Sequence, residues 1–435
     1  MVPHLKTALT GPLRELEQHF LNNSTAIEHW FREQWTEHTP PFYASCDLRN
    51  SGFKLAPVDT NLFPGGFNNL NPAFLPMCVQ AAMAAIEKFC PVARHLLLIP
   101  ENHTRNQFYL QNVAQLVAIL RQTGLNVRLG SLQTELAEPV VVDLADGRSL
   151  RLEPLVRIGN RLGLKDFDPC AILLNNDLSA GIPDILQGLT EQVVLPPVYA
   201  GWAVRRKSNH FAAYDQVARQ FAAAIGIDEW RINPAFDVCR DVNFHERQGE
   251  ACLAAKVDAL LQGIRQKYRE HGVQETPYVV VKADAGTYGM GVMTVRDASE
   301  VTALNRRQRN KMSVIKEGLE VSEVIIQEGV HTFETLGDAV AEPVVYMMDR
   351  YVVGGFYRVH TGRGKDENLN APGMHFEPLS FEACCNLPDH AETPDAPPNR
   401  FYAYGVVGRL AALAASFELE LAESVFSPGF FSNSA

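Results

Sequence analysis

The chain has 435 residues, of which 46% are apolar and 20% charged, and its formal net charge is −11. This composition is ordinary for a globular protein and excludes a disordered chain, a collagen-like fibre and a coiled coil. The length favours about two or three domains. The negative charge argues against broad binding to nucleic acid. Because no apolar run could span a membrane and the N-terminus lacks a secretory signal, we expect a cytoplasmic protein.

The eight cysteines show neither a CxxC pair nor the spacing of a zinc site. Cys384 and Cys385 are adjacent, which is a poor geometry for a disulfide. Most of the others stand in apolar surroundings, where cysteine usually acts as a small hydrophobic residue. We therefore expect reduced, structural thiols.

The first half of the chain is expected to contain a βαβ unit. Apolar spacing predicts a helix over residues 13–36, and a turn-rich stretch with one short strand, FKLAPVDTN, follows over residues 39–71. The apolar run HLLLIP predicts a buried strand, followed by a helix to about Gln122 and the strand NVRLGSL. A hairpin around Asp146-Gly147 and the strand AILLNND come next. Polar residues just after such strands are where ligands of open α/β sheets usually bind.

The second half, from about residue 200, is predicted to be richer in strands. Helices are expected over residues 201–226, 248–271 and 401–420. The segment TPYVVVKADAGTYGMGVMTV predicts two strands joined by a glycine-rich loop, and SEVIIQEGV predicts a buried strand. A long hairpin is predicted to turn at Asp349-Arg350.

The glycine-rich loop after Lys282 (KADAGTYGMG) is the sharpest local feature. Its glycines let backbone N–H groups approach a phosphate, and the lysine at the preceding strand end adds a positive charge. The loop is neither a Walker A motif nor a dinucleotide GxGxxG motif, and by itself it is equally typical of a flexible hairpin turn. Three other features of the chain favour phosphate binding by this loop. Lys207 begins a helix before it, QEGV ends a strand after it, and Arg358 precedes ENLNAPG.

This order of features resembles that of ATP-grasp enzymes. The resemblance implies that Arg358 and Lys282 are catalytic. It implies ATP binding by a set of lysines, lid glycines and linker residues: Lys207, Lys282, Gly286, Gly289, Gly291, Gln327, Glu328 and Val330. Because ATP phosphates are bridged by Mg²⁺ in such enzymes, a metal site is expected as well.

The metal ligands are not in their usual place. Most ATP-grasp chains carry them on two strands after the last helix, but only ESVFSPGFFSNSA follows Glu420 here. Asp59 and Asn61 share one face of a strand and resemble the Glu-x-Asn strand of eukaryotic-type glutathione synthetases, whose core is circularly permuted. The alternative is that the pair caps a turn. Glu342 stands where many ATP-grasp enzymes have Asp-x-Arg, and it is either a third ligand or a solvated edge residue.

We therefore predict a mixed α/β (α+β) protein with an ATP-grasp core, circularly permuted as in eukaryotic-type glutathione synthetase. Residues 1–90 would supply helices and the metal-ligand strand, and residues 91–200 an α/β substrate-binding domain. Residues 201–435 would form the nucleotide-binding and catalytic region, with a lid over residues 282–293.

Several stretches together resemble the proteobacterial glutamate–cysteine ligase (gamma-glutamylcysteine synthetase) family: DLRNSGFKLAPVDTNLFPGGFNNL, LLLIPENHTRN, LLNNDLSAGIP, RRKSNHF, KADAGTYGMGV and GGFYRVHTGRGKDENLNAPG. The resemblance spans nearly the full length. It implies ATP- and Mg²⁺-dependent joining of the γ-carboxylate of L-glutamate to the amine of L-cysteine through a γ-glutamyl phosphate, the first step of glutathione biosynthesis. The substrate-binding candidates are Arg49, Glu101, Arg105, Asn106, Asn175, Asn368 and Asn370.

Other functions stay open at this point. One is a related ATP-grasp ligase with other amino-acid or peptide substrates, such as γ-glutamylcysteine and glycine. Another is a non-catalytic nucleotide-binding sensor, which the presence of Arg358 and a metal pair disfavours. The expected partners are the small-molecule substrates, with neither nucleic acid nor membrane, and a homo-oligomer is left open.

Overall fold

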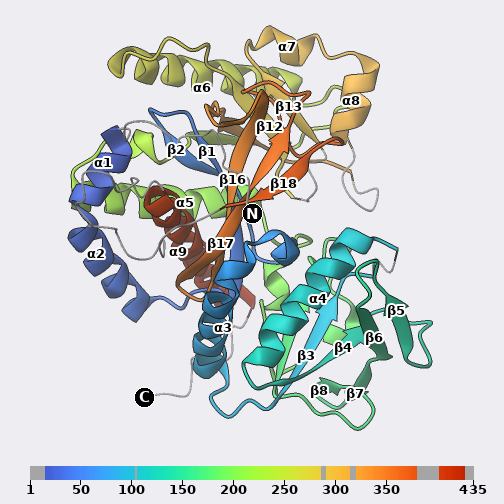
Figure 1. Ribbon diagram of the computed structural model, residues 1–435. Coiled ribbons are helices and arrows are strands. Elements are labelled where there is room, and N and C mark those ends of the chain that lie inside the picture. Colours follow the sequence, from blue (N-terminus) through green and yellow to red (C-terminus); the bar gives the residue numbers. More distant parts are fainter. Residues whose placement is uncertain (1–14, 103–104, 286–290, 314–319, 380–400, 427–435) are drawn as a thin grey trace.

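The computed structural model describes residues 15–102, 105–285, 291–313, 320–379 and 401–426. Within these residues the chain is built around three sheets of four or more strands, each covered by helices (Figure 1). We call them the central, the parallel and the third sheet. The mixed α/β class predicted from the sequence is confirmed.

The central sheet is antiparallel and combines strands from both ends of the chain. Its order is β18-β17-β16-β1-β2, with the short β15 paired to β16. The strands are β1 (Tyr43–Asn50), β2 (Leu55–Asn61), β15 (Thr335–Leu336), β16 (Ala339–Met348), β17 (Tyr351–His360) and β18 (His375–Pro378). The N-terminal strands thus complete a sheet made by late strands, as expected for a permuted ATP-grasp core.

The strand β1 corrects a prediction. The sequence pattern predicts only one short strand in this turn-rich stretch, which is β2. All but one of the residues of β1 are buried, so the strand lacks the alternation of polar and apolar residues that marks a half-buried strand. It also carries Asp47, Arg49 and Asn50, each of which has a hydrogen-bond partner on a distant segment.

The parallel sheet has the order β10-β9-β3-β4-β6-β5, and only β5 runs antiparallel to its neighbour. Its strands are β3 (His95–Pro100), β4 (Asn126–Ser131), β5 (Val140–Asp143), β6 (Ser149–Pro154), β9 (Ala171–Asn175) and β10 (Val193–Leu195). A separate hairpin joins β7 (Val156–Ile158) to β8 (Arg161–Gly163). The predicted βαβ unit is β3, α4 (Gln107–Gln122) and β4.

The third sheet is antiparallel, with the order β11-β14-β12-β13. Its strands are β11 (Phe236–Cys239), β12 (Val279–Ala283), β13 (Val292–Val295) and β14 (Val324–Glu328). The helices α6 (Glu250–Glu270), α7 (Ser299–Thr302) and α8 (Arg306–Ser313) belong to the same region, and α6 and the sheet share one core. In Figure 1 this region lies at the top of the molecule and the parallel sheet at the bottom.

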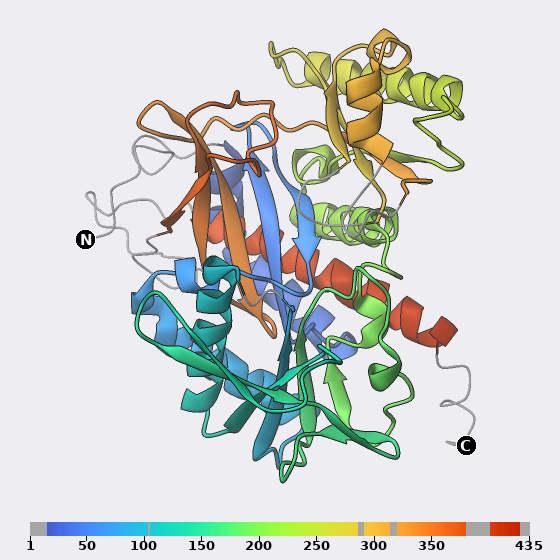
Figure 2. The same ribbon diagram turned by 90° about the vertical axis from the view of Figure 1, so that its right-hand side faces the viewer.

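Long helices pack against the central sheet. The helix α9 (Phe401–Phe426) is buried on all sides as far as Ala415, and nearly all of its residues there are apolar or aromatic; Arg409 is paired with Glu28. It runs past the central strands in Figure 2 and packs against α5 (Lys207–Ile225). The predicted helix over residues 13–36 is in fact two helices, α1 (Glu15–Asn22) and α2 (Ser24–Glu37).

The remaining helices fill the space between the sheets. The helix α3 (Leu75–Phe89) contacts β16, β17 and α4. Short 3₁₀ turns occur at η1 (Phe67–Asn69), η2 (Pro72–Phe74), η3 (Asp184–Leu186), η4 (Val198–Ala200) and η5 (Glu229–Arg231).

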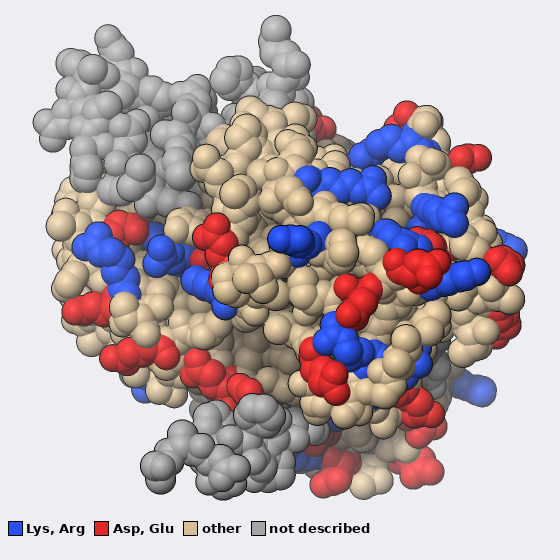
Figure 3. Space-filling view, turned by 90° about the horizontal axis from the view of Figure 1, so that it is seen from below, with Lys and Arg blue, Asp and Glu red and all other residues tan. Residues whose placement is uncertain are grey.

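Two surface properties bear on partners. Among the helices of the described residues, none combines the length and apolar character that crossing a bilayer would require. On the face shown in Figure 3, basic and acidic side chains are interspersed rather than gathered by sign. This face therefore presents no extended basic field of the kind that follows a phosphate backbone.

Candidate active site

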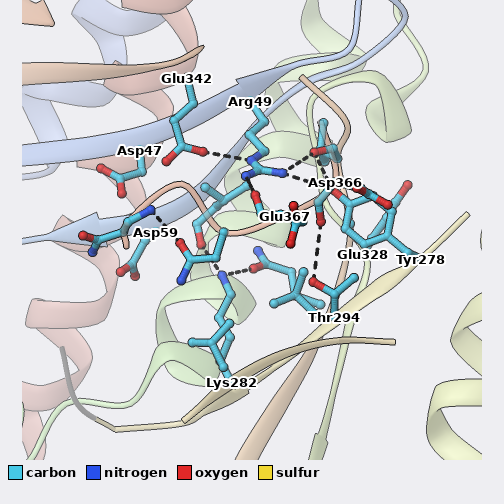
Figure 4. Close-up of a pocket in the computed structure, with 18 of the residues that line it drawn as sticks. Asp47, Arg49, Asp59, Tyr278, Lys282, Thr294, Glu328, Glu342, Asp366 and Glu367 are labelled. Carbon is cyan, nitrogen blue, oxygen red and sulfur yellow. Dashed lines mark hydrogen bonds and ion pairs between the residues drawn. The ribbon is translucent and has the colours of Figure 1, made fainter. Parts of the chain in front are cut away.

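A first cavity of about 110 Å³ lies between the third sheet and the central sheet. The strands β12, β13 and β14 line one side, and β1, β2, β16 and β17 line the other (Figure 4). Its charged and amide side chains include Asp47, Arg49, Asp59, Lys207, Lys282, Gln327, Glu342, Arg358, Asp366, Glu367, Asn368 and Asn370. The fold thus gathers most of the residues that the sequence suggested for ATP and metal.

Lys282 reaches across this cavity from β12 toward β2. Its Nζ donates to the carbonyl of Val58 and to Oε1 of Gln327, each at 2.7 Å. Burial lowers the pKa of Lys282 to about 8, although the carboxylate of Asp59 opposes this shift. The Nε2 amide of Gln327 is buried and has no hydrogen-bond partner within the described part of the chain. A ligand that offers acceptor oxygens or nitrogens here would therefore satisfy a costly donor and a desolvated cation.

Lys207 is the first residue of α5, as predicted, and its Nζ lies 2.8 Å from Oδ1 of Asp59. The same Nζ sits 4.2 Å from the ring centre of Trp202, within range of a cation–π contact. Burial raises the pKa of Asp59, but Lys207 and Lys282 outweigh it and hold that pKa at about 2. Asp59 is therefore ionised at neutral pH and stands between two cations.

Two arginines share one buried carboxylate on the central sheet. Oε2 of Glu342 accepts from Nε of Arg49 at 2.9 Å, and its Oε1 accepts from a guanidinium N–H of Arg358 at 2.6 Å. Arg358 also donates to Asp47 at 2.8 Å. Burial alone would raise the pKa of Glu342, but Arg49 and Arg358 lower it below its usual value. Glu342 is thus a buried, ion-paired carboxylate and not a solvated edge residue.

Asp47 is the site residue that sequence reasoning missed. It lies directly opposite Asp59 in the β1–β2 pair, and both line the first cavity. Burial raises the pKa of Asp47, the charge of Arg358 lowers it, and Glu342 and Asp59 raise it, so that the net shift is upward. The signal was present as Asp47-x-Arg49, an acid and a cation two residues apart, but it was overlooked because β1 itself was not predicted.

Strand alternation separates two neighbours that the sequence had grouped together. Gln327 faces Lys282, whereas the carboxylate of Glu328 accepts from Lys54 at 2.7 Å and from the indole N–H of Trp230 at 2.9 Å. Lys54 and Glu328 are both 1% exposed. The side chain of Glu328 is thus committed to the core, and its main-chain N–H donates to the carbonyl of Ala235 at 2.7 Å.

Of the other residues expected to bind ATP, the structure describes Val330 and Gly291. The carbonyl of Val330 accepts from the Tyr278 hydroxyl at 2.7 Å. Gly291 closes the loop after β12: it has a φ of +61°, and its carbonyl accepts from the N–H of Ala283. Gly286 and Gly289, within the predicted lid, lie outside the described residues.

A second cavity of about 320 Å³ adjoins the first and reaches toward the parallel sheet. The residues Asp47, Asp59, Arg358 and Asn370 line both cavities. Other polar residues of the second cavity are Ser45, Asn61, Asn68, Asn69, Glu101, Asn106, Tyr109, Asn112, Asn175, Asp177 and Trp202. The two cavities therefore meet at three charged side chains of the central sheet.

Asn175, one of the expected substrate-binding residues, lines this second cavity and makes hydrogen bonds within the protein. Every hydrogen-bonding position of the Asn175 amide is occupied: Nδ2 donates to Tyr43 and Pro64, and Oδ1 accepts from Tyr109 and Asn112. The side chain of Asn175 therefore holds the cavity wall together.

The other substrate candidates lie at several places. Glu101 lines the second cavity and accepts from the N–H of Asp177 at 2.9 Å, and Asn106 caps α4 at the rim. Arg105 is exposed and lines neither cavity. The other candidates line the first cavity: Arg49, Asn368 and Asn370.

The donor atoms of the expected metal ligands decide which of them fit Mg²⁺. No group of three or more acidic, histidine or cysteine residues close enough to hold a metal occurs among the described residues. Mg²⁺ needs only one or two carboxylates when substrate phosphates complete its octahedral shell. Asp59 and Asp47 fit this requirement, because they face each other in the cavity that holds Lys282. Glu342 is engaged by two arginines, and Oδ1 of Asn61 accepts from the N–H of Phe63 at 2.9 Å.

Similarity to known proteins gives support for a function that does not depend on the geometry of the site. The family model for GshA, glutamate-cysteine ligase, matches residues 17–419. The chain belongs to this family. It is therefore a ligase, as the sequence resemblance implied. No match was found among curated proteins.

A solved structure from Methylobacillus flagellatus KT, assigned as a gamma-glutamylcysteine synthetase, is 68% identical and has a TM-score of 0.88. The match covers 97% of this chain and 99% of that one. More remote similarities include a glutathione synthetase-like effector from Globodera pallida (10% identity, TM-score 0.39, 83% of this chain and 82% of that one). A RimK domain ATP-grasp protein from Sphaerobacter thermophilus DSM 20745 shows 13% identity, a TM-score of 0.30 and coverage of 74% and 99%.

Proposed function

We propose that this ligase uses ATP and Mg²⁺ to join the γ-carboxylate of L-glutamate to the amine of L-cysteine, forming γ-glutamylcysteine for glutathione biosynthesis. The family match and the 68% identical relative support this choice of substrates over other amino-acid pairs. Because the reaction consumes ATP and a free thiol, we place it in the cytoplasm.

One observation carries the proposal: two cavities share Asp47, Asp59 and Arg358. The first has a donor amide, Gln327, and two lysines suited to a nucleotide with phosphates. The second has the size and polarity for amino acids. A γ-carboxylate placed at the shared residues would lie next to the terminal phosphate, so the two reactants would meet where the charge is concentrated.

Each reaction step would use groups of this chain for alignment and charge. Lys207 and Lys282 would hold the phosphates while a carboxylate oxygen of glutamate attacks the terminal phosphorus and ADP departs. The uncharged amine of cysteine would then attack the acyl carbon, and phosphate would leave with the oxygen that came from glutamate and take up the proton that the amine loses. Arg358 would stabilise the oxyanion that develops in this step, a role in which a fixed donor is worth several kcal/mol, roughly 3. No protein nucleophile is needed.

Asp59 and Asp47 would hold Mg²⁺, with Asn61 as the neighbouring amide. When bound, this ion neutralises phosphate charge and orients the transferred group. We also propose the division of labour expected from the sequence: residues 1–90 supply the metal strand, residues 91–200 the amino-acid site, and residues 201–435 the nucleotide site.

The test is ADP release with a panel of amino-acid pairs, with the product identified by mass spectrometry. We expect release to require both glutamate and cysteine, and Lys282→Ala to reduce it by raising the KM for ATP or lowering kcat. Lys165→Ala, at an exposed lysine of the parallel-sheet region, is the matched control. ADP release that is independent of cysteine, or a different preferred pair, would contradict the proposal.

A further inference from the structure

The second cavity has an apolar wall whose exposure the fold alone does not account for. Phe108, in the first turn of α4, is 81% exposed, and Phe376, on β18, is 36% exposed, yet both line this cavity together with Met374. The ring of Phe376 rests edge-on against Phe356, with centroids 4.8 Å apart. Exposed apolar groups that gather in one concave place usually mark a surface that a ligand covers.

The two phenylalanines come from different layers of the molecule. Phe108 belongs to the parallel-sheet region and Phe376 to the central sheet, so a ligand between them would touch both. The polar end of the same cavity holds Asp47, Asp59 and Arg358. A molecule that filled the cavity would therefore have charged groups at one end and an apolar group at the other.

Of the two amino acids in the proposed reaction, only one has an uncharged side chain. Glutamate carries three ionised groups, which would be poorly solvated against phenylalanine rings. Cysteine carries a small polarisable thiol, and sulfur makes favourable contacts with aromatic rings. Its amine must also reach the shared charged residues, where the acyl carbon would lie.

We propose that Phe108 and Phe376 form the site for the side chain of the acceptor amino acid and select a thiol or small apolar side chain over a hydroxyl. This inference rests on the proposed function, because it names the acceptor subsite of that reaction. An apolar wall of this kind discriminates against an added hydroxyl by roughly 10- to 100-fold. L-2-Aminobutyrate, which replaces the thiol with a methyl group, should therefore be accepted better than L-serine.

The test begins with Phe108→Ala, which leaves the core intact because the ring is mostly in solvent. We expect the KM for cysteine to rise roughly tenfold, with the KM values for glutamate and ATP changed less than about twofold. The preference for cysteine over serine should fall by a similar factor. Ile158→Ala is the control, because Ile158 is 74% exposed on β7 and lines neither cavity. Phe376→Ala should act in the same direction.

A binding measurement separates this inference from the proposed function. L-2-Aminobutyrate is titrated calorimetrically into the protein with ADP, Mg²⁺ and glutamate, conditions in which no ligation occurs. Weaker binding in Phe108→Ala but not in Ile158→Ala supports the inference. Unchanged binding in the Phe108→Ala/Phe376→Ala double variant, no binding to the unaltered protein, or a rise in the glutamate KM instead overturns it. A lack of cysteine-dependent ADP release in the unaltered protein counts against the proposed function.

Discussion

The central sheet carries the charged side chains of the site inside its strands, whereas two strands of the parallel sheet, β3 from Leu96 on and β9, are apolar up to their carboxyl ends. Asp47, Arg49, Glu342 and Arg358 all stand mid-strand on β1, β16 and β17. In β9, by contrast, the apolar run ends at Asn175, and polar residues follow in the loop. The two sheets therefore contribute to the same pair of cavities in different ways.

The difference shows how each sheet balances stability with function. A charge inside a strand is tolerated only with a partner on a neighbouring strand, so the pairs of the central sheet contribute to both folding and chemistry. Polar groups at the ends of parallel strands lie near solvent and bind ligands without disturbing the strands. Substitutions in the central sheet should therefore have the larger effects.

The largest effect is expected for Arg358→Ala. Removing this guanidinium leaves Glu342 and Asp47 without a shared partner, which should lower the free energy of unfolding by about 3–5 kcal/mol. Ligation should fall by about 10³-fold or more. Urea unfolding and the rate of ADP release measure the two effects. Arg350→Ala, at the exposed tip of the same hairpin, is the control. A normal unfolding curve for Arg358→Ala would remove the contrast between the sheets.

Asp59→Asn should come next, with an effect on activity rather than on folding. The substitution keeps the size of the side chain but removes the charge that faces Lys207 and the proposed Mg²⁺. We expect turnover to fall by roughly 10²–10³-fold and the Mg²⁺ concentration for half-maximal rate to rise. Asp143→Asn, at an exposed acid of β5, should change neither. An unaltered rate for Asp59→Asn at limiting Mg²⁺ would show that the metal lies elsewhere.

Asn175→Ala tests the parallel sheet. The variant removes the hydrogen bonds of the Pro64 carbonyl and the Asn112 amide to this side chain, while Tyr43 and Tyr109 keep other acceptors, so the free energy of unfolding should fall by about 1–3 kcal/mol. Because the amide of Asn175 is held by protein partners, we expect the KM values for both amino acids to change less than about threefold in the folded protein. Asn126→Ala, at an exposed asparagine of β4, controls for the substitution type. A large, selective rise in one KM would restore the substrate role expected from the sequence.

The smallest effect is a pH dependence centred on Lys282. Its pKa of about 8 lies below the ordinary value near 10.5, because burial disfavours the charged form. Without a ligand the amine is therefore mostly neutral at pH 9, whereas a bound phosphate would restore the charge. ADP binding at pH 9 should then take up about one proton and be weaker than at pH 7.5 by up to about tenfold. Calorimetry in two buffers of different ionisation enthalpy measures the uptake, which Lys282→Met should abolish.

The lowered pKa of Lys282 also makes the free energy of unfolding depend on pH. Between about pH 8 and pH 10.5 the unfolded chain would bind more protons at Lys282 than the folded chain. This residue's contribution therefore makes the ligand-free protein more stable as pH rises through that window. Thermal unfolding of the Lys282→Met variant should lack this component, and Lys165→Met should retain it.

Sequence patterns were most informative for the parallel sheet and for local order along the chain. The apolar runs at β3 and β9 predicted their strands directly, and the placement of Lys207 at a helix start and Lys282 at a strand end followed from neighbouring residues alone. The glycine-rich loop and the acid–amide pair at Asp59 were visible for the same reason. Each is a local pattern, set by backbone propensity and side-chain spacing.

Only the tertiary structure decided which polar residues share partners. Glu328 and Gln327 are adjacent in sequence, yet pairing across the third sheet turns one toward Lys54 and the other toward Lys282. The amide of Asn175, which the sequence suggests for substrate binding, makes its hydrogen bonds to residues from distant segments. Asp47 was not predicted because a strand that is buried on both faces lacks the alternation of polar and apolar residues that would identify it. The spacing of residues thus determined the motifs, whereas long-range burial and pairing determined which side chains remained free for chemistry.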